Sequence, residues 1–179
     1  MLHADALEQA DADRLVALLH AGIAWRQETA TLMGRRVPIP RLTAWHGVAG
    51  YVYSGIRLTP AAWTPPLLEL KAVAERLAGQ PFNSVLLNLY RDGRDSVSWH
   101  ADNEPGLGRD PVIASISLGA VRRFQLKHRR AAARLMLDLP HGSCLVMAGG
   151  TQHHWLHQLP KTARAVGPRI NLTFRQMLQ

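Results

Sequence analysis

Two stretches decide how this sequence folds: Ser98-Trp99-His100-Ala101-Asp102-Asn103-Glu104, and Arg169-Ile170-Asn171-Leu172-Thr173-Phe174-Arg175 near the end of the chain. On a β-strand, residues two apart point to the same face, so His100 and Asp102 can bind one ion together. A third ligand from a distant strand would complete a set of two histidines and one carboxylate. That set leaves coordination positions open and suits a non-haem Fe(II) oxygenase.

The second stretch predicts a strand with two chemically different faces. Arg169, Asn171, Thr173 and Arg175 fall on one face, and the apolar residues between them fall on the other. Two arginines that line the interior of a barrel need anions as partners. A small dicarboxylate meets that need, since each guanidinium can hold one carboxylate with two parallel hydrogen bonds.

Together, His-x-Asp, a later histidine and Arg-x-Asn-x-Thr-x-Arg resemble the signature of the AlkB family of Fe(II)/2-oxoglutarate dioxygenases. The resemblance runs from about Trp25 to Arg175. Asn88-Leu89-Tyr90 is similar to the family's Asn-x-Tyr, which precedes the His-x-Asp motif. The combined motifs are specific, whereas His-x-Asp alone would be weak.

The second metal histidine could be His153, His154 or His157, which lie on or beside one predicted strand. Alternation places His153, Trp155 and His157 on one face and His154 on the other. In the family, this histidine stands twelve residues before the first tail arginine and two after an aromatic residue. His157 fits both spacings, so the resemblance implies that His100, Asp102 and His157 are the metal ligands and the catalytic centre.

The co-substrate site follows from the same resemblance. Arg169 and Arg175 would hold the two carboxylates of 2-oxoglutarate, in an order that the sequence leaves open. Asn88, Tyr90 and Asn171 would add hydrogen bonds to it. The implied cofactors are Fe(II), 2-oxoglutarate as co-substrate and O2.

Composition places the chain among compact proteins with an apolar core. Its 179 residues are 47% hydrophobic, and no apolar run reaches the roughly 20 residues of a membrane helix. The N-terminal residues lack the pattern of a signal peptide, and the one cysteine, Cys144, excludes an internal disulfide. We therefore expect a cytoplasmic protein that does not enter a membrane.

The pattern of elements predicts an α+β fold that is mainly β. Helical spacing appears at residues 6–20 and 67–77, the second ending at Gly79. Strands are expected at 85–90, 96–101, 112–118, 122–128, 133–139, 143–148, 153–158 and 169–176. This succession indicates a double-stranded β-helix, or jelly roll. We expect one domain over residues 1–179, with covering helices and a nucleotide-recognition hairpin region over about 1–80 and the jelly-roll core over about 82–177.

Substrate-binding residues are predicted in the N-terminal half and after the metal motif. Leu32 and Met33 lie at an expected hairpin tip beside Arg35, where an apolar wedge can fill the gap left by an extruded base; the alternative is that they are core residues. Tyr51 and Tyr53 share a strand face, and the resemblance implies that they stack on the base; the alternative is simple strand packing. Glu104 and Asn103 follow the metal pair and could contact the base. Arg41 belongs to a basic cluster with Arg35.

The net charge of +8 favours a polyanion as partner, although an arginine-rich proteome alone would also give it. The resemblance implies oxidative demethylation of N1-methyladenine and N3-methylcytosine in DNA, or in RNA, with release of formaldehyde. Two rivals are a hydroxylase or demethylase of the same family acting on RNA, protein or lipid, and a cupin-like nucleic-acid-binding module without activity. We expect a monomer.

Overall fold

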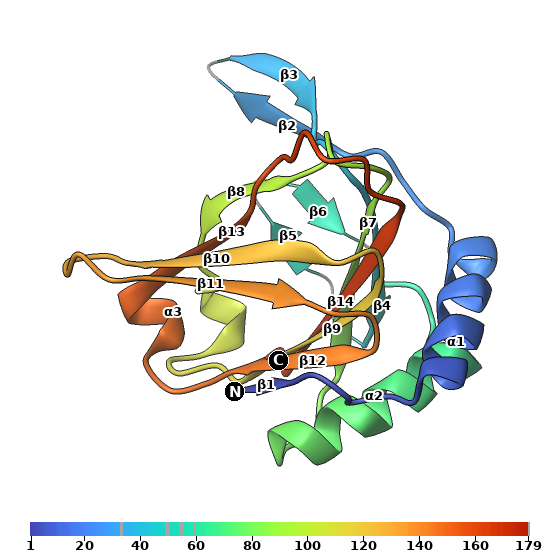
Figure 1. Ribbon diagram of the computed structural model, residues 1–179. Coiled ribbons are helices and arrows are strands. Elements are labelled where there is room, and N and C mark those ends of the chain that lie inside the picture. Colours follow the sequence, from blue (N-terminus) through green and yellow to red (C-terminus); the bar gives the residue numbers. More distant parts are fainter. Residues whose placement is uncertain (33, 49–50, 54–55, 59, 179) are drawn as a thin grey trace.

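A computed structural model of the chain describes residues 1–32, 34–48, 51–53, 56–58 and 60–178, and for residues 32, 51–53 and 56–58 it describes the backbone alone. In this part of the chain, two antiparallel sheets face each other and helices cover one of them (Figure 1). The larger sheet has the order β1-β12-β9-β14-β7-β4, and the smaller has the order β11-β10-β13-β8. The expected jelly-roll core is confirmed.

The larger sheet combines jelly-roll strands with two strands from the N-terminal half, β1 and β4. Its strands are β1 (Leu2–His3), β4 (Leu42–Gly47), β7 (Ser84–Tyr90), β9 (Ile113–Gly119), β12 (Ser143–Met147) and β14 (Arg169–Arg175). The smaller sheet contains β8 (Val97–His100), β10 (Arg122–His128), β11 (Arg134–Leu139) and β13 (Trp155–Leu159). A 3-10 turn, η1 (Pro105–Leu107), follows the metal motif.

Two helices pack on the outer face of the larger sheet, α1 (Gln9–Gly22) and α2 (Pro65–Ala78) (Figure 1). Prolines suit the first turn of α2, because the first amides of a helix have no partner within it. The helix ends where Gly79 takes a left-handed conformation with φ of 70°, as the sequence predicted. The buried residues of both helices, including Leu15 and Leu19 of α1 and Leu67 and Leu70 of α2, face the sheet.

The main apolar core lies between these helices and the sheet, outside the barrel. Ile170, Leu172 and Phe174 of β14 point into it with Leu15 of α1 and Leu70 of α2. A second apolar cluster between the two sheets includes Phe124, Leu126 and Leu145. Because β14 gives its apolar side to the helices, its polar side faces the barrel interior. This arrangement leaves room inside the barrel for a polar site.

Two small hairpins stand apart from the sheets. One consists of β2 (Thr29–Leu32) and β3 (Arg35–Pro38), and it projects from one end of the barrel (Figure 1). The other consists of β5 (Tyr51–Tyr53) and β6 (Ile56–Leu58). The hairpin expected around residues 31–36 is therefore present, and Tyr51 and Tyr53 lie on a strand as predicted.

The segment before β13 differs from the prediction. Residues 153–158 were expected to form one strand, but α3 (Thr151–His154) precedes the strand, which begins at Trp155. The alternation that placed His153 and His157 on one face was wrong, because a helical turn does not alternate. His153 instead reaches the carboxylate of Asp110, with its Nε2 at 2.9 Å from Oδ1, and both it and His154 are exposed.

Candidate metal and co-substrate centre

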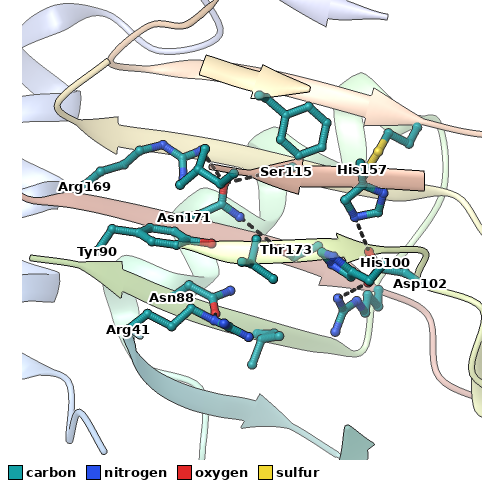
Figure 2. A pocket seen from close by; sticks show the side chains of 16 residues that line it. Arg41, Asn88, Tyr90, His100, Asp102, Ser115, His157, Arg169, Asn171 and Thr173 are labelled. Carbon is teal, nitrogen blue, oxygen red and sulfur yellow. Dashed lines mark hydrogen bonds and ion pairs between the residues drawn. The ribbon is translucent and has the colours of Figure 1, made fainter. Parts of the chain in front are cut away.

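A polar cavity lies inside the barrel, and its lining residues come from both sheets (Figure 2). His100, Asp102 and His157 stand at one end, and Arg169 and Tyr90 stand at the other (Figure 2). The side chains between them include Asn88, Asn171, Thr173, Ser115 and Arg41. The polar face of β14 thus runs along the cavity from one end to the other.

The three predicted metal ligands converge although they are distant in sequence. One possible ligand atom from each of His100, Asp102 and His157 lies within 4.8 Å of the others. The register explains this, since β13 pairs with β8 so that His157 faces His100 directly. Asp102 lies two residues beyond the end of β8, so its position comes from the following loop and not from strand alternation.

An irregularity in β8 also contributes. His157 pairs with His100, and Leu159 pairs with Val97, so β8 has one residue more than β13 over this interval. Such a β-bulge re-aims side chains. Here it allows both Val97 and His100 to line the cavity.

The hydrogen bond of His100 to the main chain orients its ring toward the other two ligands. His100 Nδ1 contacts the Ser98 carbonyl oxygen at 2.7 Å. A carbonyl can only accept, so Nδ1 carries the hydrogen and Nε2 keeps its lone pair. His100 Nε2 and His157 Nε2 each lie 3.8 Å from an oxygen of Asp102. These three groups therefore point toward a common position.

The protonation states also suit metal binding near neutral pH. Burial would raise the pKa of Asp102, but the positive charge of Arg175, with smaller effects of His157 and His100, lowers it to about 2. Burial lowers the pKa of His157 to about 4. The carboxyl is therefore ionised and His157 is neutral, which are the forms that coordinate metals.

The two tail arginines occupy different environments. The Arg175 guanidinium lies beside the metal residues, with Nη2 at 3.1 Å from Asp102 Oδ1. Arg169 is 1% exposed and donates to the hydroxyl of Ser117 at 2.8 Å and to the Asn171 side-chain oxygen at 2.6 Å. Burial lowers its pKa to about 10, so it stays charged at neutral pH. Within the described residues, Arg169 makes no ion pair with a carboxylate.

A chain of hydrogen bonds orders the cavity wall. Asn171 receives hydrogen bonds from Arg169 and from Ser115, and donates to Thr173 at 2.9 Å. The Tyr90 ring lies 5.4 Å from the Arg169 guanidinium. The wall is therefore fixed around a cation that no carboxylate in the described part of the chain neutralises.

Sequence models of known families agree with this geometry. A model described as the 2OG-Fe(II) oxygenase superfamily matches residues 1–175.

The chain belongs to the 2OG-Fe(II) oxygenase superfamily.

Within this superfamily its relatives carry AlkB names, which confirms the AlkB resemblance. It is 43% identical over 175 residues to the Bos taurus alpha-ketoglutarate-dependent dioxygenase alkB homolog 3, covering 92% of this chain and 61% of that protein. It is 41% identical over 157 residues to the Mus musculus DNA oxidative demethylase ALKBH2, covering 82% and 66%. The solved structure of OsALKBH1 superposes with a TM-score of 0.69 at 15% identity, covering 98% of this chain and 97% of that one, which shows the shared fold.

The cavity fits the metal and co-substrate that the superfamily's name states. Its ligand set of two histidines and a carboxylate is suited to Fe(II). Among the described residues, the buried Oδ1 atom of Asp102 accepts no hydrogen bond, and the hydrogen bonds of buried Arg169 go to neutral groups. A dianion in the cavity would neutralise that charge, as 2-oxoglutarate would.

The structure places the other predicted residues as follows. Asn88, Tyr90, Asn171 and the two tail arginines line the cavity. Arg41, predicted to bind substrate, is buried there and donates to Asn88 Oδ1 at 2.7 Å. Arg35 and Asn103 are exposed, and Glu104 is half-buried; none of the three lines the cavity. Met33 and the side chains of Leu32, Tyr51 and Tyr53 lie outside the described residues.

Sequence reasoning missed the residues that support this wall. Ser115 and Ser117 bond along it, and the Arg122 guanidinium lies 5.9 Å from the centre of the Tyr90 ring. The alternation of β9 could have indicated Ser115 and Ser117, because both serines interrupt an apolar strand at a spacing of two. The role of Arg122 had no sequence signal beyond its charge.

Proposed function

We propose that this chain is an Fe(II)/2-oxoglutarate dioxygenase that removes methyl groups from N-alkylated nucleobases, N1-methyladenine and N3-methylcytosine, in DNA. The observation that carries the proposal is the shared cavity of the His100, Asp102 and His157 cluster with the two tail arginines. The names of the relatives support the same reaction class. The chain spans about 61% of the length of the first relative that it matches, so activity, substrate and partner are proposed for it and not transferred.

The two arginines would divide the co-substrate between them. Arg175 lies beside the metal residue Asp102, so it would pair with the carboxylate next to the keto group. Arg169 lies at the far end with Tyr90, so it would hold the distal carboxylate (Figure 2). When bound, iron and 2-oxoglutarate would supply the oxidising chemistry, in which O2 and 2-oxoglutarate give succinate and CO2 and one oxygen atom is inserted into a methyl C–H bond of the base. The hydroxymethyl group then leaves as formaldehyde.

The residues of the chain have supporting roles in this reaction. His100, Asp102 and His157 would hold the iron, and the neutral His157 ring packs against Phe124, with ring centroids 5.3 Å apart. Phe124 lines the cavity and belongs to an apolar cluster with Leu126, which would limit access of water from that side. Limited water protects a reactive site from side reactions.

A nucleic acid partner is supported by basic side chains on exposed segments. Arg129 and Arg130 at the tip between β10 and β11 are exposed, as are Arg35 and Arg36 of β3. Charged groups on protruding hairpins can contact phosphates with little desolvation cost. N1-methyladenine and N3-methylcytosine are cationic and cannot pair normally, so extruding them from a duplex costs less than extruding an intact base. The same features would serve RNA, and a monomeric state and a cytoplasmic location stay predictions.

The test is a single-turnover reaction. The protein is loaded without oxygen with Fe(II) and 2-oxoglutarate, then mixed with air and an oligonucleotide that contains N1-methyladenine. Mass spectrometry follows the loss of the methyl group and the formation of succinate. The proposal predicts both products with the wild type and neither with His100→Ala.

Two other outcomes would change the proposal, and parallel substrates would identify the preferred nucleic acid. Succinate without demethylation would retain the dioxygenase and exclude N1-methyladenine as a substrate. Neither product from an iron-loaded protein would exclude the enzyme and favour a binding module. Parallel single-stranded DNA, duplex DNA and RNA substrates rank the polymers, because each contains the same lesion.

A further inference from the structure

Gln152 is a buried side chain that bonds to the backbone of a metal-site residue. It lies in α3 and is 0% exposed. Its side-chain oxygen accepts a hydrogen bond from the Asp102 main-chain N–H at 2.9 Å, across 50 residues of sequence. Its side-chain nitrogen contacts the sulfur of Met147 at 3.9 Å, and Met147 lines the cavity.

The amide of Asp102 needs this partner because it has left the sheet. The residue follows the end of β8, and a buried main-chain amide without a partner destabilises the fold. Asp102 is therefore fixed at two points. Gln152 holds its main chain, and Arg175 contacts its carboxylate at 3.1 Å.

The same contact joins the two chain segments that carry the ligands. The helix α3 ends at His154, and His157 follows on β13. A bond from Gln152 to Asp102 therefore connects the segment of His157 to the loop after His100. A side-chain amide suits this position because it accepts a hydrogen bond and carries no charge. A carboxylate in its place would repel Asp102.

We propose that Gln152 is a positioning residue for the metal centre, which sets the Asp102 main chain so that its carboxylate meets the two histidines in one coordination site. The inference rests on the proposed function only in taking the ligand of this site to be a divalent metal. A purely structural role would differ in one respect, because it would affect the stability of the fold and leave metal affinity unchanged.

The test measures metal binding directly. Co(II) is titrated without oxygen into the full chain, and its visible absorption reports both affinity and coordination geometry. Gln152→Met removes the acceptor and keeps the volume. We expect its dissociation constant for Co(II) to rise by about 10- to 100-fold, as losses of supporting contacts around metal ligands do. The absorption band should also change.

Thr151→Ala is the matched control. Thr151 lies in the same helical turn, and its hydroxyl donates to the Ala148 carbonyl at 2.6 Å. We expect it to lower the melting temperature of the metal-free protein and to bind Co(II) like the wild type. Gln152→Asn, which is shorter by one methylene, serves as second test variant if the methionine variant does not fold, and it should also bind Co(II) weakly.

The outcomes separate this inference from the proposed function. A wild-type dissociation constant and spectrum in a folded Gln152 variant would overturn the inference. Co(II) binding that is lost in His100→Ala and weakened in the Gln152 variants, in a protein that does not demethylate the oligonucleotide, would support the inference and reject the proposed function. A wild-type chain that binds no Co(II) would overturn both.

Discussion

Arg169 provides a quantitative prediction, because its charge is buried without an ion-pair partner among the described residues. Its pKa of about 10 reflects burial, which disfavours the charged form. At 1.36 kcal/mol per pKa unit, the charged form is disfavoured by roughly 3 kcal/mol in the fold. The two hydrogen bonds to Ser117 and Asn171 return about 1 kcal/mol each. The side chain therefore contributes little to the stability of the ligand-free protein.

Arg169→Met removes the charge and retains most of the volume. We expect the ligand-free variant to be as stable as the wild type or more stable by about 1 kcal/mol, since replacing a buried charge with an apolar side chain is often neutral or stabilising. 2-Oxoglutarate at 100 times its dissociation constant should stabilise the wild type by about 2.7 kcal/mol and should not stabilise the variant. Urea unfolding with and without 2-oxoglutarate measures both quantities.

Arg122→Met is the contrasting variant. Arg122 is 3% exposed, but it donates to the main-chain oxygens of Asp92, Asp95 and Pro160 at 3.0, 3.0 and 2.7 Å. Its loss removes three hydrogen bonds to main-chain oxygens, which should cost about 3 kcal/mol or more. If Arg169→Met were as unstable as Arg122→Met, or if 2-oxoglutarate still stabilised it, the account of a cavity arranged around an incoming dianion would be refuted.

Three further changes test other parts of the molecule. Burial would raise the pKa of Asp95, but hydrogen bonds from Arg91 outweigh this effect and lower the pKa. Asp95→Asn should therefore reduce the free energy of unfolding by about 1.5–3 kcal/mol at neutral pH. In urea unfolding this difference should fade as the pH falls below about 4, and a difference that stays constant with pH would contradict the ion pair. Replacing exposed Arg129 and Arg130 by glutamine should reduce the slope of log affinity for single-stranded DNA against log salt by about 1.4, and an unchanged slope would remove this hairpin tip from the interface. Phe174→Ala should cost about 3–5 kcal/mol in thermal unfolding, because the ring is fully buried beneath the helices; a cost below about 1 kcal/mol would contradict that packing.

The fold was predictable where side-chain periodicity reports burial directly. The alternation of β14 correctly separated Ile170, Leu172 and Phe174 from the polar residues between them, and Gly79 correctly marked the end of α2. Both signals are local, because period and turn chemistry depend on neighbouring residues. The sequence could not show that the apolar side of β14 packs against helices, since this depends on where α1 and α2 lie in the fold.

The residues that form the metal site were predictable from the sequence, but the residues that hold them in place were less so. Motif spacing brought His100, Asp102 and His157 into one hypothesis, and the structure brings the three side chains together. The helical turn α3 was missed because its four residues are too few for a periodic pattern. Gln152 could not be found for a related reason: its partner is 50 residues away, and one buried glutamine leaves no pattern.

The position of β8 has a consequence for motion. In the described part of the chain, β8 forms the edge of the smaller sheet and pairs only with β13, so its outer amides lack a neighbouring strand. An ion held by His100 and His157 would cross-link β8 to β13 through their side chains. This cross-link would make it harder for the edge strand β8 to separate from the sheet. Amide protons of residues 97–100 should then exchange with solvent rapidly before metal loading and slowly after it. Those of β14, which lies between β7 and β9, should be protected in both states.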